Sequence, residues 1–185
     1  RFIYTIPNFQ NPSGATMSLE KRKRLYALAK AYNVLILEDN PYGELRVKGE
    51  HLPSIKSFDE DGIVLYAGSF SKIFAPGVRV AYVIAPSPIV AKMTVGKQAS
   101  DVHTPVLNQM LVERWMATTD FEAHIEKIRG IYRRKLNLMC DLIDEKLGGF
   151  VEYVRPEGGM FVWCKLPERV DMMDFCNKAV QNKVA

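Results

Sequence analysis

Hydrophobic residues along this chain form two kinds of run. Three runs are short, continuous and rich in β-branched residues, at positions 34–37, 63–67 and 78–85. This pattern is typical of parallel strands covered by helices on both faces, because neither side of such a strand needs polar residues. A further strand is expected at residues 4–6. The sequence therefore predicts an α/β fold with a mostly parallel sheet.

The remaining stretches have the periodicity of amphipathic helices. The first, of about 15 residues, follows Ser18, a suitable N-cap, and carries Glu20 near the positive end of the helix dipole. Three more helices are expected at residues 87–99, 105–117 and 120–147. Short strands near 151–154 and 160–164 and a helix from Asp171 follow. This change of pattern predicts that residues 1–120 belong to a large domain, and that residues 121–185 form a linking helix and part of a small α+β domain.

Composition narrows the class of protein. Apolar residues make up 48% of the 185 positions and charged residues 25%, which are ordinary values for a globular chain. No apolar run approaches the length of about 18 residues that a membrane span needs. The three cysteines have no C-x-x-C spacing, which indicates reduced thiols and a cytoplasmic location. The three histidines are scattered, so no metal site is expected.

The net charge of +4 is mild, and its densest cluster is the basic run at residues 21–24. Such a run can bind nucleic acid or act as a localisation signal. However, it lies on the first predicted helix, whose apolar positions include Leu25, Leu28 and Ala29. A solvated outer face of that helix is therefore the favoured interpretation.

Three of the predicted strands are each followed by residues that can do chemistry. Asn11 follows the first strand through a short turn, Asp39 follows the second directly, and residues 69–72 follow the third. Ligands of doubly wound sheets bind beyond the carboxyl ends of the strands, so these groups are expected to meet at one edge. Tyr42 lies three residues after Asp39, and Arg79 lies seven residues after the end of the third group.

A pyridoxal phosphate (PLP) cofactor would give each of these side chains a role. The Lys72 amine can bind an aldehyde covalently and then transfer protons. Asp39, at the end of an apolar strand, needs a partner such as a pyridinium N–H. Arg79 can grip a phosphate bidentately, and the small hydroxyls of Ser69 and Ser71 suit the same group. Taken singly, these residues also fit a surface lysine, a loop aspartate and a strand-edge arginine, so the prediction depends on their combination.

The order of these motifs resembles the class I/II aminotransferases of PLP fold type I. The motifs are Asn-Pro-x-Gly at 11–14, Asp-x-x-Tyr at 39–42, Ser-x-Ser-Lys at 69–72 and the arginine at 79. The resemblance continues through Pro-Glu-Gly-Gly-Met-Phe at 156–161. Residues 5–12 and 38–42 are most similar to the 2-aminoadipate and kynurenine aminotransferase branch. Ala81 stands where the family usually has glycine, which concerns local packing only.

This resemblance implies a role for each predicted site residue. Lys72 binds PLP, Asp39 bonds the pyridine nitrogen, and both Tyr42 and Asn11 bond the ring oxygen. The phosphate is held near Ser69, Ser71 and Arg79. The implied fold is fold type I, represented here by part of the large domain with a mostly parallel sheet and part of the small C-terminal domain.

The implied activity is transfer of an amino group between an α-amino acid and a 2-oxo acid, in a homodimer. Both ends of the chain look cut, so we expect a piece of a longer polypeptide. In the family, a glycine-containing loop, a stacking aromatic residue and a carboxylate-binding arginine lie elsewhere, so these residues alone are expected to be inactive.

Two other functions share the same motifs. One is the aminotransferase-like domain of a helix-turn-helix transcription regulator, which would bind nucleic acid through an upstream domain. The other is a PLP-dependent carbon–sulfur lyase. Ser69-x-x-Lys72 also matches the nucleophile motif of penicillin-binding proteins. Their second motif is not completed, because Val102 follows Ser100-Asp101, and their Lys-Thr-Gly motif is absent from the sequence.

Overall fold

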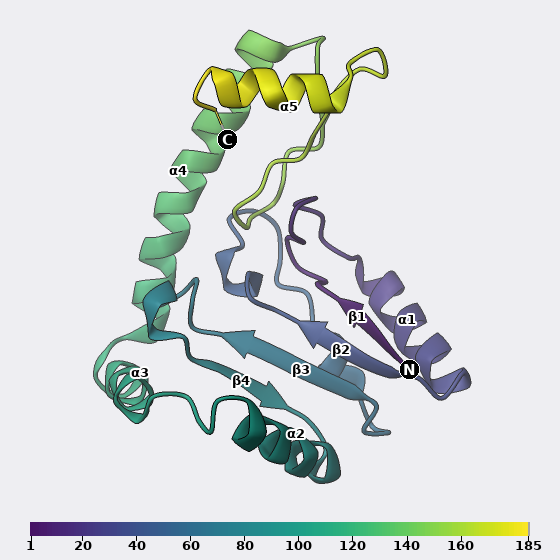
Figure 1. Cartoon of the computed structure of the whole chain (residues 1–185), viewed down its shortest axis with the longest axis vertical. Coiled ribbons are helices and arrows are strands. Elements are labelled where there is room, and N and C mark those ends of the chain that lie inside the picture. Colours follow the sequence, from purple (N-terminus) through teal and green to yellow (C-terminus); the bar gives the residue numbers. More distant parts are fainter. Residues whose placement is uncertain (185) are drawn as a thin grey trace.

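The computed structural model describes residues 1–184 and contains two sheets and five α-helices within them (Figure 1). The elements, in chain order, are β1 (Phe2–Thr5), α1 (Leu19–Ala31), β2 (Leu35–Asp39), η1 (Gly43–Leu45), η2 (Ile55–Phe58), β3 (Val64–Ser69), η3 (Pro76–Val78), β4 (Ala81–Ile84), α2 (Ser87–Ser100), α3 (Val106–Thr118), α4 (Phe121–Leu147), β5 (Glu152–Tyr153), β6 (Cys164–Lys165) and α5 (Met172–Gln181). The expected order of helices and strands is thus confirmed. The two late strands are shorter than expected, with two residues each.

The main sheet has the order β1-β2-β3-β4, and its first three strands are parallel. Ile3 pairs with Ile36, and Ile36 pairs with Val64, so the three strands are in register. This confirms a mostly parallel sheet. The crossover between β1 and β2 is α1, as the strand–helix–strand pattern predicts.

The prediction for residues 78–85 was wrong in two respects. The strand there, β4, runs antiparallel to β3, and all four of its residues are exposed rather than buried on both faces. The reason is the connection from β3, which consists of residues 70–80 and contains only the short helix η3. Such a connection can return the chain antiparallel, whereas a parallel return needs a longer crossover, usually with a full helix.

Helix α1 covers one face of the sheet and begins as predicted at Ser18, whose hydroxyl accepts a hydrogen bond from Lys21 N. Its inward face brings Ala29 against Ile36 and Val64, which are all at most 1% exposed. Burying such side chains contributes about 1.5–3 kcal/mol each for the larger ones, so this layer is the main source of stability near the site.

The basic run on α1 is only partly a solvated face. Lys21, Lys23 and Arg24 are exposed, but Arg22 is 0% exposed. It stands three positions before Leu25 and seven before Ala29, so the helical period turns it toward the sheet. Its guanidinium donates to the carbonyl oxygens of residues 7, 17 and 53 and to Asn8 Oδ1. The prediction was therefore wrong for this one residue.

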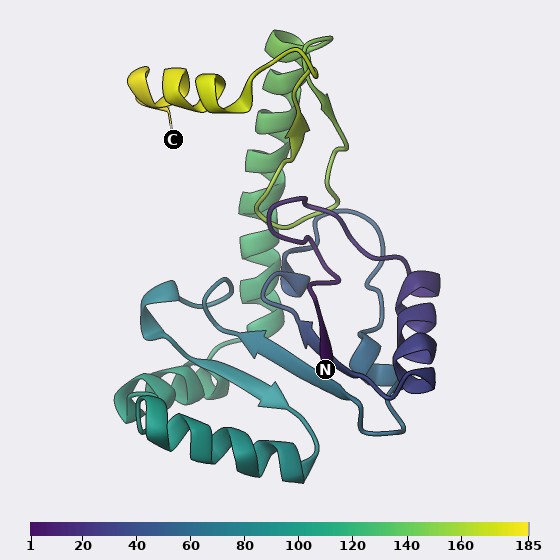
Figure 2. The same cartoon turned by 45° about the vertical axis from the view of Figure 1, so that its right-hand side comes forward.

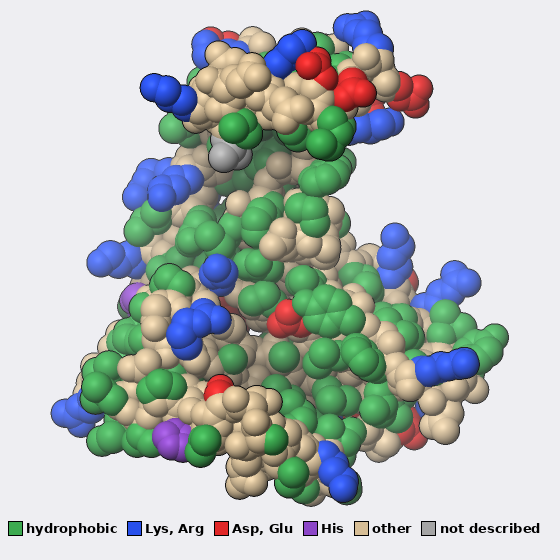
Figure 3. Space-filling view, viewed as in Figure 1, with side chains coloured by type: hydrophobic (Ala, Val, Ile, Leu, Met, Phe, Trp, Pro, Cys, Tyr) green, Lys and Arg blue, Asp and Glu red, His purple; other side chains and the backbone are tan. Residues whose placement is uncertain are grey.

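Helices α2 and α3 follow β4 and leave much apolar surface open. Helix α2 has no buried residue, and α3 buries only Val112 among its described positions. In Figure 3, hydrophobic side chains cover much of the part of the surface where the sheet and these helices lie. Within residues 1–184, the face of the sheet opposite α1 is not covered by a packed helix in the way that α1 covers the first face.

Helix α4 leads away from the sheet and carries β5, β6 and α5 at its far end (Figures 1 and 2). Its N-cap is Asp120, which accepts a hydrogen bond from Ala123 N at 3.0 Å. The segment after β5 returns to η1, where Gly159 N donates to Leu45 O at 3.0 Å. The division of the chain at residue 120 stays a prediction; α4 begins at the next residue. No helix among residues 1–184 has the length and apolar character needed to cross a membrane.

Candidate active site

The carboxyl ends of β1, β2 and β3 meet at one edge of the sheet. Asp39, the last residue of β2, pairs with Ala67 of β3, and Thr5 at the end of β1 pairs with Glu38. Ser69 ends β3 two residues beyond that pair. The loops that carry the other predicted site residues all leave from this edge, because the three strands point the same way.

The Asp39 carboxylate is held by a residue that we did not predict for the site. Tyr4 Oη donates a hydrogen bond to Asp39 Oδ2 at 2.7 Å. This bond, with smaller contributions from burial and from the negative charge of Asp39, raises the pKa of Tyr4 to about 12. The sequence predicts Tyr4 only as part of a strand, since no local pattern links it to a residue 35 positions later.

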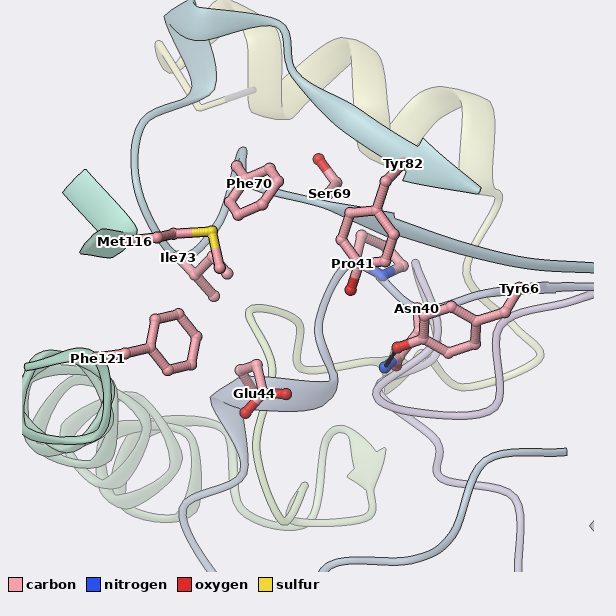
Figure 4. A pocket seen from close by; sticks show the side chains of 10 residues that line it. All are labelled: Asn40, Pro41, Glu44, Tyr66, Ser69, Phe70, Ile73, Tyr82, Met116 and Phe121. Carbon is pink, nitrogen blue, oxygen red and sulfur yellow. Dashed lines mark hydrogen bonds between the residues drawn. The ribbon is translucent and has the colours of Figure 1, made fainter. Parts of the chain in front are cut away.

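The backbone directly after Asp39 is fixed by amide hydrogen bonds. Asn40 N donates to Ala67 O at 2.9 Å, and Asn40 Oδ1 accepts from Asn8 Nδ2 at 2.8 Å. Asn40 Nδ2 donates to Tyr66 Oη at 2.7 Å, the contact drawn as a dashed line in Figure 4. Two separate segments, β3 and the loop after β1, therefore hold the residue next to the carboxylate.

Buried Arg22 extends this network beneath the edge. Its Nη2 donates to Asn8 Oδ1 at 2.6 Å and to Pro7 O at 3.1 Å. A hydrogen-bonded chain thus runs from Arg22 through Asn8 and Asn40 to Tyr66. Because every link is a directional polar contact in a largely buried place, the chain fixes the loops after β1 and β2 relative to each other.

Lys72 lies in the loop that joins β3 to β4. Phe70 N donates to Val80 O at 3.2 Å and closes the base of this loop, and Phe74 N donates to Phe70 O at 2.9 Å across the lysine. Lys72 is partly buried. Within residues 1–184 its amine forms no hydrogen bond or ion pair, with Asp39 or with any other side chain.

The lysine loop is also attached to α3 and α4. His124 on α4 places its Nε2 2.8 Å from Ile73 O, directly after the lysine. The Phe74 ring packs on Trp115 with 4.7 Å between centroids, and Trp115 contacts the His124 ring edge-on at 5.1 Å. An anchored loop holds its lysine at a defined position, which catalytic geometry requires.

Three predicted phosphate ligands converge at the other end of this loop. Ser71 N donates to Ser69 Oγ at 3.1 Å, and Arg79 Nη1 lies 3.5 Å from Ser71 Oγ. Arg79 does not lie in a strand, as the predicted run at 78–85 implied: it follows η3 with a φ of 54°, and β4 starts two residues later. The left-handed backbone turns the chain there, and Arg79 remains exposed.

Tyr42 and Asn11 lie on the two loops nearest the C-terminal segment. Tyr42 is 7% exposed, and its ring meets the edge of Phe161 with centroids 5.5 Å apart. Asn11 is exposed, on a turn that ends at Gly14 with a φ of +66°. A Cβ on Gly14 would come within 2.8 Å of Phe161 O, so glycine is required for this close approach.

A cavity of about 350 Å³ lies beside the site, and Figure 4 shows the side chains that line it. Four aromatic rings line its wall, and its polar groups are the Glu44 carboxylate, the Asn40 amide, the Ser69 hydroxyl and the phenols of Tyr66 and Tyr82. Of the seven predicted site residues, Ser69 lines this cavity. The cavity therefore adjoins the predicted cofactor site and does not coincide with it.

Several known proteins are similar to this chain over its whole length. The model of the family "Aminotransferase class I and II" matches residues 3–185. Aromatic-amino-acid aminotransferase 1 of Thermococcus litoralis is 42% identical over the whole chain, which covers 44% of that protein. The crystal structure of Pyrococcus horikoshii kynurenine aminotransferase, in complex with PMP, superimposes with a TM-score of 0.95 at 39% identity; the match covers all of this chain and 46% of that one.

A relative of another kind matches the same residues. The uncharacterized HTH-type transcriptional regulator YdfD of Bacillus subtilis is 30% identical over 98% of this chain, which covers 38% of that protein. The chain thus spans less than half the length of each of these relatives. Fold, motif order and family model agree on the class. The chain belongs to the class I and II aminotransferases and has the PLP fold type I, with part of its α/β domain present.

Proposed function

We propose that these residues form part of the PLP site of an aminotransferase that moves an amino group between an α-amino acid and a 2-oxo acid. The observation that carries the proposal is the approach of Ser69, Ser71 and Arg79 at the strand edge that also ends in Asp39. Family membership supports the same activity.

The donor set at the lysine loop suits a phosphate. Two hydroxyls, the Ser71 backbone N–H and a guanidinium lie within one short segment, and all can donate to phosphate oxygens. Within residues 1–184, Arg79 forms no ion pair, and its hydrogen bonds are to Ser71 Oγ and Pro76 O. This chemistry fits the phosphate of PLP.

Asp39 provides an anion for the other end of the cofactor. Its Oδ2 is bonded to Tyr4, and within residues 1–184 its Oδ1 has no hydrogen-bond donor. A carboxylate so placed can accept a hydrogen bond from a pyridinium N–H and keep that nitrogen protonated. When bound, PLP supplies an aldehyde and an electron-accepting ring.

Lys72 is assigned the covalent attachment and the proton transfer. An amine on an anchored loop can bind the aldehyde, and after release it can take and return the proton of the substrate α-carbon. Tyr42 and Asn11 are assigned to the ring oxygen, the first through its hydroxyl and the second through its amide. Both lie on loops that leave the same edge.

The cellular setting is also a proposal. We infer a cytoplasmic protein, because Cys140, Cys164 and Cys176 are free thiols in the described structure. We infer a homodimer, since exposed apolar side chains on β4, α2 and α3 offer a surface that a partner can cover. Amino-acid metabolism is the matching role.

Replacing Lys72 by alanine in the full polypeptide that contains these residues tests the assignment. After borohydride reduction, mass spectrometry should detect no covalently bound cofactor in Lys72→Ala. The rate of transamination should fall by about 10²- to 10⁴-fold. Lys92→Ala, an exposed lysine on α2, is the matched control and should change neither. A Lys72→Ala protein that still carries covalent PLP would refute the lysine assignment.

A regulator remains the second candidate, because YdfD matches almost the whole chain. Both candidates require the same PLP residues, so Lys72→Ala does not separate them. Transamination assays and electrophoretic mobility-shift assays with the full polypeptide do. Turnover of amino acids without DNA binding supports the enzyme, whereas PLP-dependent DNA binding without turnover supports the regulator.

A further inference from the structure

Tyr4 and Asp39 come together through the register of β1 and β2. Tyr4 pairs with Leu37, and Asp39 is two residues beyond that partner, on the same face of the sheet. Diagonal neighbours of this kind lie within reach of an aromatic side chain. The resulting Oη–Oδ2 distance of 2.7 Å is typical of an O–H donor to a carboxylate.

We propose that Tyr4 is a positioning residue of the cofactor site: it holds Oδ2 of Asp39, so that Oδ1 faces a pyridinium N–H. The inference rests on the proposed function of Asp39 and adds a residue to it. Tyr4 itself is not assigned any contact with the cofactor or with the substrate.

The backbone next to Asp39 is already held in place, so Tyr4 acts on the side chain of Asp39. Asn40 is tied to Ala67 O, to Asn8 and to Tyr66, so the chain directly after the carboxylate residue is fixed. The remaining freedom of Asp39 is rotation about its own side-chain bonds. Within residues 1–184, the hydrogen bond from Tyr4 is the one side-chain hydrogen bond that restricts this rotation.

The phenol of Tyr4 remains a donor over the whole working range of pH. Its pKa of about 12 lies far above neutrality, so it stays protonated and does not add a second negative charge beside Asp39. Tyr4 is 54% exposed, and such an exposed contact contributes little to folding. Loss of the hydroxyl should therefore affect the cofactor more than the stability.

The contact itself can be tested without cofactor. In the apo form of the full polypeptide labelled with [13Cζ]tyrosine, the Tyr4 signal should titrate with a midpoint of about 12. In Asp39→Asn the midpoint should fall toward the ordinary value of 10.0, because the acceptor is no longer an anion. The signal of Tyr32, a 76% exposed ring on the end of α1, should not change. An unchanged Tyr4 midpoint in Asp39→Asn would overturn the inference.

The consequence for the cofactor is tested with Tyr4→Phe in the same polypeptide. We expect the dissociation constant for PLP to rise about tenfold, as for loss of one hydrogen bond to a charged group, and the pH titration of the cofactor absorbance to shift. The urea midpoint should remain within error of the parent, and Tyr32→Phe should alter none of these quantities.

Two outcomes contradict a positioning role. Unchanged PLP affinity and absorbance in Tyr4→Phe would show that Asp39 needs no such support. A loss of affinity that only follows a lower urea midpoint would show a merely structural role. Neither outcome changes the result of Lys72→Ala, so failure of this inference and failure of the proposed function remain distinguishable.

Discussion

The two faces of the main sheet differ in how deeply their side chains are buried. On the face toward α1, Ile36, Glu38 and Val64 are all 0% exposed. On the opposite face, Phe2 and Tyr4 of the edge strand β1 are 65% and 54% exposed, and Leu35, Leu37 and Asp39 of β2 are only partly buried. Residues that are one position apart along β1 or β2 therefore lie in different surroundings, as strand alternation dictates.

This difference separates stability from chemistry. The α1 face contains buried charges that are fully partnered: Arg22 with its carbonyl acceptors, and Glu38, whose oxygens accept from Ile55 N and Lys56 N. The open face contains Asp39, whose second oxygen is left for a ligand. Mutations on the first face should reduce folding stability, whereas polar mutations on the second should alter cofactor binding first.

Arg22→Met should have the largest effect on stability. It removes the donors to Pro7 O, Pro53 O and Asn8 Oδ1 from a place without water access. Breaking a buried charged network of this kind costs about 3–5 kcal/mol, measured by urea denaturation. Lys23→Met, the exposed neighbour, should cost less than about 0.5 kcal/mol. Equal midpoints for the two variants would contradict the buried role of Arg22.

Glu38→Ala should follow, with a cost of about 2–3 kcal/mol for two buried N–H groups left without an acceptor. Burial raises the pKa of Glu38 above the ordinary 4.5, although the N–H groups of Lys56 and Ile55 offset part of this effect. Because the pKa is higher in the folded state, the protonated carboxyl stabilises the folded protein at pH values below 4.5. This contribution is lost as the pH rises through the folded-state pKa. The difference in stability between the parent and Glu38→Ala should therefore be larger at pH 4 than at pH 8. A difference that grows toward pH 8 would contradict this assignment.

Local patterns were sufficient to predict most of the fold. Ser18 caps α1 as expected, and the buried runs at 34–37 and 63–67 became β2 and β3. Sequence reasoning failed where partners come from far along the chain. In the sequence Arg22 resembles one of four surface cations, because two of its acceptors, at residues 52 and 53, lie 30 and 31 positions away. The run at 78–85 has the apolar pattern of a buried parallel strand. Its actual direction depends on the preceding loop, which that pattern does not reveal.

The candidate site shows the same limit. Arg79 approaches Ser71, and this proximity can be expected from the sequence because both residues lie in one loop. Their role in phosphate binding stays a prediction. The positions of Lys72, Tyr42 and Asn11 relative to Asp39 stay a prediction. Tyr4 had no local signal at all: its link to Asp39 exists only through the pairing of two strands.

The smallest expected change in stability, that of Phe2→Ser, tests most directly whether the two faces of the sheet differ in burial. In the 185-residue chain, Phe2→Ser should change the free energy of unfolding by less than about 0.5 kcal/mol, because the ring is already in water. Ile3→Ser, one position later, faces the core with Ala29 and Ile36 and should cost about 1.5–3 kcal/mol. Urea denaturation of both variants gives the comparison. Similar costs for Phe2 and Ile3 would mean that the chain buries its open face, for instance against a second copy. The same pair in the full polypeptide would then show whether a further layer covers Phe2, since its cost should rise only if one does.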